Sequence, residues 1–171
     1  MKGLTLIELM VVLVLIVILM GIAVYVFVTV FISWSGQVTR AGIDVTLDRA
    51  VEEIVRDLRQ ARAINYAMSN NEIRFTDFDH DHYVYYFYNE NDGYPPGFGE
   101  ELYEIRKAPL AGNIYGTFVY GSGVAIIKDV VPPPSSKLST DDTEMAIAID
   151  LSVKRESETI RSGTEVRPRN L

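Results

Sequence analysis

The side chains best suited to metal chemistry lie in the run Asp77-Phe78-Asp79-His80-Asp81-His82. Alternating carboxylates are ligands that Ca²⁺ prefers, and paired imidazoles can hold a transition metal. The run has no glycine-turned ligand loop and no distant bidentate glutamate that would complete a calcium site. We therefore interpret Asp77, Asp79 and Asp81 as carboxylates of a solvated turn between strands, with a metal site as the alternative.

No other spacing in the chain indicates catalysis. A Ser/His/Asp hydrolase requires a recognisable motif around its nucleophile, and the sequence has none. The run Tyr83–Tyr88 is explained by strand propensity rather than by an adhesive surface. The sequence therefore predicts a protein that is not an enzyme and that needs no cofactor.

Glu8 is a carboxylate at the edge of a long apolar stretch. Leu9–Ile32 contains no charged residue, and as a helix it would be about 36 Å long, enough to cross a hydrocarbon core. A charge at mid-bilayer costs about 2.5–3.5 kcal/mol, and somewhat less near the interface, so Glu8 is expected to have a partner. No basic side chain between Leu4 and Thr39 supplies one.

The order of features before this stretch differs from that of a secretory signal peptide. A signal peptide has its small-residue cleavage site after the apolar core, whereas Gly3 stands before the core and follows the basic residue Lys2. Cleavage after Gly3 leaves the apolar helix on the mature protein and creates an ammonium at Leu4, one turn from Glu8. The ammonium of a neighbouring subunit is a natural partner for Glu8.

The run Lys2-Gly3-Leu4-Thr5-Leu6-Ile7-Glu8-Leu9, followed by the apolar stretch, resembles the prepilin signature of type IV pilins and type II secretion pseudopilins. The resemblance implies that a membrane peptidase cuts between Gly3 and Leu4. It also implies that Leu4 becomes the N-methylated first residue and that Glu8 is the assembly glutamate. The chain departs from the family in three ways: Leu4 replaces the commoner phenylalanine, no proline interrupts the apolar helix, and no cysteine is present for a carboxyl-terminal disulfide. An ordinary signal anchor is the competing interpretation.

The resemblance also implies partners and a location. The partners are other pilin or pseudopilin subunits, the prepilin peptidase, an inner-membrane assembly platform and membrane lipid. The expected location is the inner membrane, as a single-pass protein with a cytoplasmic amino terminus and an exported head, and then a periplasmic or cell-surface filament. Lys2 before the span supports this orientation. The segments Asp57–Ala61 and Val166–Asn170 are similar to those of minor pilins and J-like pseudopilins.

Composition agrees with one domain behind this anchor. The chain has 171 residues and a formal net charge of −7, and the part beyond the apolar stretch is long enough for one compact domain. The acidity argues against nucleic acid as a partner, because phosphate binding requires a basic patch.

Residues 33–70 have the pattern of an amphipathic helix. Apolar residues recur at steps of three and four over Leu47–Ala61, while the opposite face is charged. We predict one nearly continuous helix over Leu4–Met68. Residues 4–32 are its transmembrane and assembly half, and residues 1–3 are a leader peptide.

Residues 71–171 have the period of two that is typical of strands and are expected to form a β-rich head. The cleanest alternation, over Met145–Val153, predicts a half-buried strand. Val131–Ser136 contains three prolines and is expected to be an exposed extended loop. The other expected strands are 72–75, Tyr83–Tyr88, Leu102–Lys107, Ile114–Tyr120, Val124–Val131 and a short final pair, Glu156–Ile160 and Glu165–Arg167.

Together these patterns predict an α+β, pilin-like fold in which a long amino-terminal helix packs its apolar stripe on an antiparallel β-sheet. The predicted function is that of a structural subunit, a minor pilin or pseudopilin of a type IV pilus or type II secretion pseudopilus. It is made as an inner-membrane prepilin, cleaved, N-methylated and assembled through its helix. The alternative is a membrane-anchored exported domain that binds a metal or another ligand through the Asp77–His82 run and does not polymerise.

Overall fold

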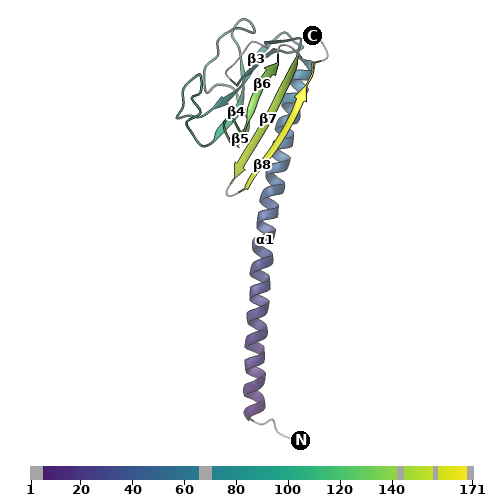
Figure 1. The fold of residues 1–171 in the computed structure, drawn as a ribbon, viewed down its shortest axis with the longest axis vertical. Helices are drawn as coiled ribbons and strands as arrows, with labels where there is room; N and C mark the ends of the chain where they lie inside the picture. The colour runs from purple at the N-terminus through teal and green to yellow at the C-terminus, as the bar shows by residue number, and fades with distance from the viewer. Residues whose placement is uncertain (1–5, 66–70, 142–144, 156–157, 169–171) are drawn as a thin grey trace. The chain divides into compact units, whose positions relative to one another are not determined.

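The computed structural model describes residues 6–65, 71–141, 145–155 and 158–168. By its internal contacts the chain divides into two compact units, Met1–Ala41 and Gly42–Leu171. The described elements, shown in Figure 1, are α1 (Leu6–Gln60), β1 (Ala63–Asn65), β2 (Ile73–Thr76), β3 (His82–Tyr88), β4 (Tyr103–Pro109), β5 (Val124–Val130), β6 (Lys137–Asp141), β7 (Ala146–Arg155) and β8 (Glu158–Val166).

The described part of the first unit is helical throughout. From Leu6 to Val38 every side chain of α1 is exposed. Many of these residues are valine and isoleucine, which have modest helix propensity in water. A helix nevertheless satisfies all of its backbone groups within one segment, which is what an apolar environment demands.

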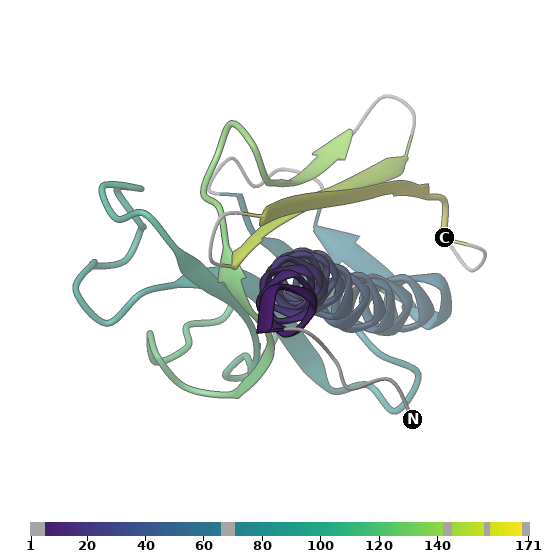
Figure 2. The ribbon, with the colours of Figure 1, turned by 90° about the horizontal axis from the view of Figure 1, so that it is seen from below.

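In the second unit, the Gly42–Gln60 segment of α1 packs on a curled antiparallel sheet (Figure 2). The buried side chains of the helix follow the predicted stripe, and they join those of the strands in one core. The predicted α+β, pilin-like fold is therefore confirmed. The buried helix residues are Ile43, Leu47, Ala50, Val51, Ile54 and Leu58.

The strands lie in the order β1-β2-β3-β4-β5-β7-β6, with β8 on the remaining edge of β7, and every pairing is antiparallel. Two strands share one edge of β7, because β5 pairs with it at Val153 and β6 pairs with it over Ala146–Asp150. Between these two contacts the buried Ser136 hydroxyl accepts a hydrogen bond of 2.8 Å from the Ser152 N–H.

The central strand β7 confirms the clearest sequence pattern. Ile147, Ile149, Leu151 and Val153 are all fully buried in the core. Each alternates with a residue on the opposite face, as the period of two requires.

The helix ends earlier than predicted. α1 stops at Gln60 rather than near Met68, and the next residues form β1. The Arg62 N–H donates to the Thr76 carbonyl at 2.8 Å, and Ala63 pairs with Thr76 in the β1–β2 ladder. The ladder therefore takes the backbone groups that a longer helix would use. Residues 66–70 lie outside the described residues.

The predicted strand at Ile114–Tyr120 is wrong. Its first residues turn, with the Gly116 N–H donating to the Asn113 carbonyl at 2.8 Å. The side chains of Phe118 and Tyr120 then pack on the outer face of the sheet instead of extending it. Packing on a second apolar face thus outweighs strand propensity.

Three smaller predictions also need correction. The final pair of short strands is one continuous strand, β8, although residues 156 and 157 lie outside the described residues. The polar strand β6 gives too little alternation to be predicted. The proline segment forms a turn, with the Ser135 N–H donating to the Pro132 carbonyl at 3.2 Å, and ends at the fully buried Ser136 rather than being exposed throughout.

Candidate functional site

The amino-terminal part of α1 holds the residues that the sequence singled out. Glu8 lies in its first turn, where the positive end of the helix dipole favours a carboxylate. Gly3 and Leu4 lie outside the described residues. The spacing of one helical turn between Leu4 and Glu8 therefore remains a prediction.

The apolar side chains around Glu8 are not covered by the chain's own fold. From Leu6 to Ile32 the large apolar residues are at least 47% exposed, and Leu6 is 80% exposed. A continuous apolar surface of this length indicates contact with lipid or with other helices. Within the described residues, α1 is the helix whose length and composition suffice to cross a membrane.

Hydroxyl groups along this helix are satisfied by its own backbone. Thr29 donates to the Tyr25 carbonyl at 2.9 Å, and Ser35 donates to the Ile32 carbonyl at 2.9 Å. Thr39 donates to the Ser35 carbonyl at 3.1 Å. Such bonds lower the cost of placing a hydroxyl in an apolar environment. They span three or four residues along the helix.

The acidic run forms the turn between β2 and β3. One carboxylate oxygen of Asp77 accepts the N–H groups of Asp79 and Asp81, each at 2.9 Å. His80 accepts from Arg62 at 3.0 Å, and His82 bonds to the Thr76 hydroxyl at 2.9 Å.

The two histidines thus bond to different residues, Arg62 before β1 and Thr76 in β2, and Asp77 serves to close the turn. In the part of the chain that the structure describes, no group of three or more acidic, histidine or cysteine side chains is placed to hold a metal ion. Metal-free folding remains a prediction.

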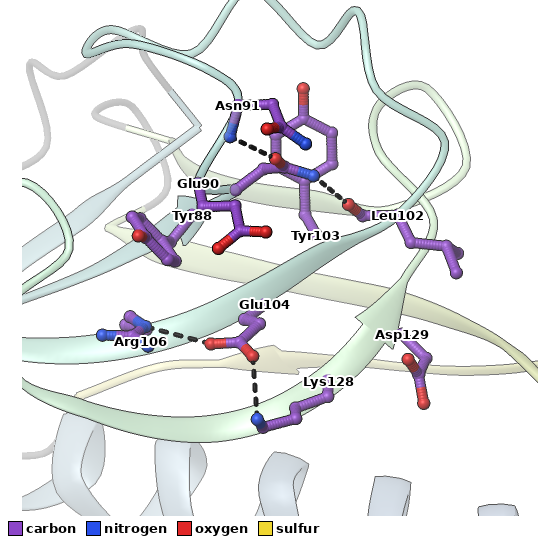
Figure 3. A pocket seen from close by; sticks show the side chains of 10 residues that line it. Tyr88, Glu90, Asn91, Leu102, Tyr103, Glu104, Arg106, Lys128 and Asp129 are labelled. Atoms are coloured by element: carbon purple, nitrogen blue, oxygen red, sulfur yellow. Dashed lines mark hydrogen bonds and ion pairs between the residues drawn. The ribbon is translucent and has the colours of Figure 1, made fainter.

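The head carries a polar groove of about 370 Å³ between β4, β5 and the loop after β3 (Figure 3). In its floor, Glu104 accepts from Lys128 and from Arg106, both at 3.0 Å. Partial burial alone would raise the pKa of Glu104, but these ion pairs lower it below its ordinary value. Arg106 and Lys128, the basic side chains in the floor of the groove, are thus both paired with Glu104. The sequence analysis did not identify this groove.

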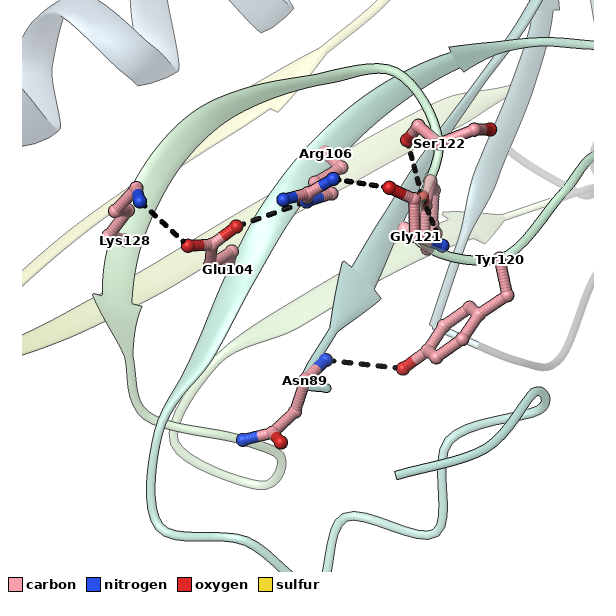
Figure 4. Close-up of polar contacts among 8 residues, drawn as sticks. Asn89, Glu104, Arg106, Tyr120, Gly121, Ser122 and Lys128 are labelled. Atoms are coloured by element: carbon pink, nitrogen blue, oxygen red, sulfur yellow. Dashed lines mark hydrogen bonds and ion pairs between the residues drawn. The ribbon is translucent and has the colours of Figure 1, made fainter. Parts of the chain in front are cut away.

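Arg106 also fixes the loop between β4 and β5 (Figure 4). Its guanidinium donates to the Gly121 carbonyl and lies 4.3 Å from the centre of the Tyr88 ring. The Tyr86 hydroxyl donates to the Ser122 carbonyl at 2.7 Å, and the Tyr120 hydroxyl accepts from the Asn89 N–H at 3.2 Å. These contacts give the loop its position on the outer face of the sheet.

A buried ion pair adjoins the same loop. Arg74 donates to Glu72 at 2.8 Å. Both residues are buried, with Arg74 7% exposed and Glu72 1% exposed. Tyr94 donates to the other Glu72 oxygen at 2.8 Å, and Arg74 donates to the Gly116 carbonyl at 2.8 Å. Loops that carry Tyr94 and Gly116 thus cover the side of β2 on which Glu72 and Arg74 lie.

Comparison with known families agrees with these features. Residues 1–24 match the prokaryotic N-terminal methylation motif, which is characteristic of type IV pilins and pseudopilins. The matched range includes Gly3, Leu4 and Glu8. No match was found among curated proteins or among solved structures.

The motif and the fold together define the class of protein. A pilin-like α+β fold follows an amino-terminal methylation motif, and the motif belongs to a structural, non-enzymatic class. It supports a type IV pilin-like or pseudopilin-like prepilin. In general it implies processing by a prepilin peptidase and assembly with other pilin subunits. The apolar helix fits a membrane-anchored protein with a single span.

Proposed function

We propose that the protein is a minor pilin or pseudopilin that enters a filament through the amino-terminal part of α1. The main support for this proposal is that the methylation motif occurs on a helix whose side chains from Leu6 to Ile32 are all exposed. Lipid covers these side chains before assembly, and the helices of other subunits cover them afterwards. The head keeps its own core and needs no such cover.

Processing creates an ammonium that can pair with Glu8 of another subunit. Cleavage between Gly3 and Leu4 and methylation of Leu4 leave an ammonium at the new amino terminus. The ammonium of an incoming subunit then pairs with Glu8 of a subunit already assembled. In an apolar bundle this pairing neutralises two charges that would be costly to leave alone.

The proposed location follows from this sequence of events. The prepilin stands in the inner membrane with its amino terminus in the cytoplasm and its head exported. An assembly platform then moves it into a periplasmic or cell-surface filament. The similarity of Val166–Asn170 to the tails of minor pilins and J-like pseudopilins supports a subunit of low copy number, and the proposed role is structural rather than enzymatic.

The mass of the mature protein tests this function. We expect the loss of Met1–Gly3 and the gain of one methyl group. Gly3→Val should block the cut because it adds bulk at the cleaved bond. Gly21→Ala is the matched control, since a Cβ at Gly21 meets nothing within 4 Å, and it should mature normally. A Gly3→Val chain with the wild-type amino terminus would contradict the leader assignment.

A further inference from the structure

β8 presents a long edge that its own sheet does not use. This strand of nine residues pairs with β7 from Glu158 opposite Arg155 to Val166 opposite Ile147. Among the described residues β7 is its partner strand, and no strand lies along its outer side in Figure 1. Alternate N–H and C=O groups along that outer edge therefore have no ladder partner, which is the usual template for adding a strand.

The two faces of β8 differ in chemistry. Arg161, Gly163 and Glu165 are exposed on the outer face. Val166 is buried, and Ile160 is half-buried against the core. Ser162 and Thr164 lie between them on the same inward side and are half-buried. A partner strand must therefore match charge on the outer face and, on the inner face, a polar middle with apolar ends.

The sequence of β8 is complementary to itself when two copies run antiparallel with Gly163 opposite Gly163. In this register Arg161 of each copy faces Glu165 of the other on the outer face. Ile160 faces Val166 on the core side. Opposing residues lie on the same face, and the groups that point outward on one strand meet those of the other. Arg161 and Glu165 of each copy then both meet the opposite charge.

Neighbouring registers lose this match. With Ser162 at the centre, Arg161 faces Gly163 and no Arg–Glu pair forms. With Thr164 at the centre, Arg161 faces Arg167 of the other copy. A shift that changes the parity turns the apolar face of one strand toward the charged face of the other. The register centred on Gly163 is thus the complementary one.

We propose that the outer edge of β8 is an interface for a second copy of this chain, paired antiparallel about Gly163. Within one copy, Arg161 lies 3.5 Å from Asp150, and Arg167 lies 3.2 Å from Glu165. These pairs are exposed and therefore contribute little alone. Association extends them into a row of alternating charge: Asp150 and Arg161 of one copy, then Glu165 and Arg167 of the other.

This contact is distinct from filament assembly and does not rest on the proposed function. A two-fold interface closes after two copies, whereas a filament needs a head-to-tail contact that repeats. The antiparallel pairing also points the Gly42–Gln60 segments of the two copies in opposite directions. A contact confined to one pair of nine-residue strands belongs to the class of weak interfaces.

Charge exchange on the full chain in detergent micelles tests the proposal. We expect sedimentation equilibrium to show dimers with a dissociation constant of about 100 µM. Arg161→Glu and Glu165→Arg should each weaken dimerisation about tenfold, because each puts like charges opposite one another twice. The double variant should bind more tightly than either single variant, since every Arg–Glu pair between copies becomes Glu–Arg at unchanged net charge. Its affinity should stay somewhat below that of the wild type, because the Arg161–Asp150 and Glu165–Arg167 pairs within each copy are lost.

Two controls separate this register from general charge effects. Arg56→Glu makes the same charge change on an exposed part of α1 and should leave the dimer nearly unchanged. Circular dichroism verifies that each variant is folded. A wild-type chain that stays monomeric, or a folded double variant that binds no more tightly than the single variants, overturns the proposal. Association that ignores all of these substitutions also overturns it and assigns the contact to the apolar part of α1.

Discussion

Glu8 is the single residue on which the proposed assembly depends. Its carboxylate lies in the first turn of a helix whose other side chains there are apolar and exposed. Breaking a buried charge pair by removing one member costs about 3–5 kcal/mol. Glu8→Leu should therefore leave insertion and cleavage intact, because the span only becomes more apolar, and should strongly reduce incorporation into filaments. Counting tagged subunits in sheared filaments measures this.

Glu8→Gln is the control for shape. It keeps the length of the side chain but removes the charge, so it should fail in assembly as Glu8→Leu does. Incorporation of both variants at the wild-type level would contradict the pairing of Glu8 with an ammonium and would favour an ordinary membrane anchor.

Asp92 organises the loop between β3 and β4. Its carboxylate accepts the Tyr103 hydroxyl at 2.7 Å and the N–H groups of Gly93, Gly97 and Phe98 at 2.8, 3.0 and 3.1 Å. The hydrogen bond from Tyr103, supported by the backbone N–H groups, outweighs desolvation and lowers the pKa of Asp92. The loop is therefore held by the ionised form of this side chain.

The lowered pKa sets the pH dependence of this contribution. The stabilisation is fully present above the unfolded pKa of about 3.9, and it is lost as the pH falls through the lower folded pKa. Asp92→Asn should lower the Tm at pH 7 by about 2–5 °C. The difference from wild type should shrink below about pH 4. Thermal unfolding of the full chain in detergent measures it, with the exposed Glu90→Gln as control; a difference independent of pH would contradict this role.

At the scale of elements, the pair of Glu72 and Arg74 ties β2 to two loops. Arg74→Met leaves the Glu72 carboxylate buried without its cation, which typically costs about 3–5 kcal/mol. The double variant Glu72→Leu/Arg74→Met removes both charges and should be less destabilised than Arg74→Met alone. Urea unfolding of the full chain gives the comparison. A double variant as unstable as the sum of its single changes would contradict a coupled pair.

Elements whose pattern reflects one local environment were predictable from the sequence. The stripe of α1 and the alternation of β7 each show a single buried face, so period alone identifies them. Residues 114–120 were misinterpreted because the outer face of the sheet is also covered, by the loops that carry Phe118 and Tyr94. β1 has only three residues and depends on its pairing with β2, which no local pattern reveals.

The residues of the candidate site likewise include some that the sequence identifies and others that it does not. Gly3, Leu4 and Glu8 are found from the sequence because processing acts on a short linear motif. The groove around Glu104 was not predictable, since Lys128 and Glu104 meet only through the pairing of β4 with β5. Asp77 illustrates the converse, because an acidic run in sequence serves the backbone of its own turn.

At the scale of the whole molecule, the two units meet different demands. Residues 6–41 expose apolar side chains along a helix, while the second unit encloses one core and a smaller outer cluster. The second unit therefore draws its stability from burial and from internal ion pairs. We expect it to unfold cooperatively without any contribution from a bound ion.

Thermal unfolding with and without a chelator tests this expectation on the full chain in detergent. A calcium ion that binds only the folded state at about 100 times its dissociation constant would add about 2.7 kcal/mol, which is several degrees of Tm. We expect no such shift, because Asp77 already accepts two backbone N–H groups and His80 and His82 bond to different partners. A drop in Tm that calcium restores, and that Asp79→Asn or Asp81→Asn abolishes, would give the β2–β3 turn a metal after all. Because those two variants spare the carboxylate of Asp77 that closes the turn, they separate loss of an ion from loss of the turn itself.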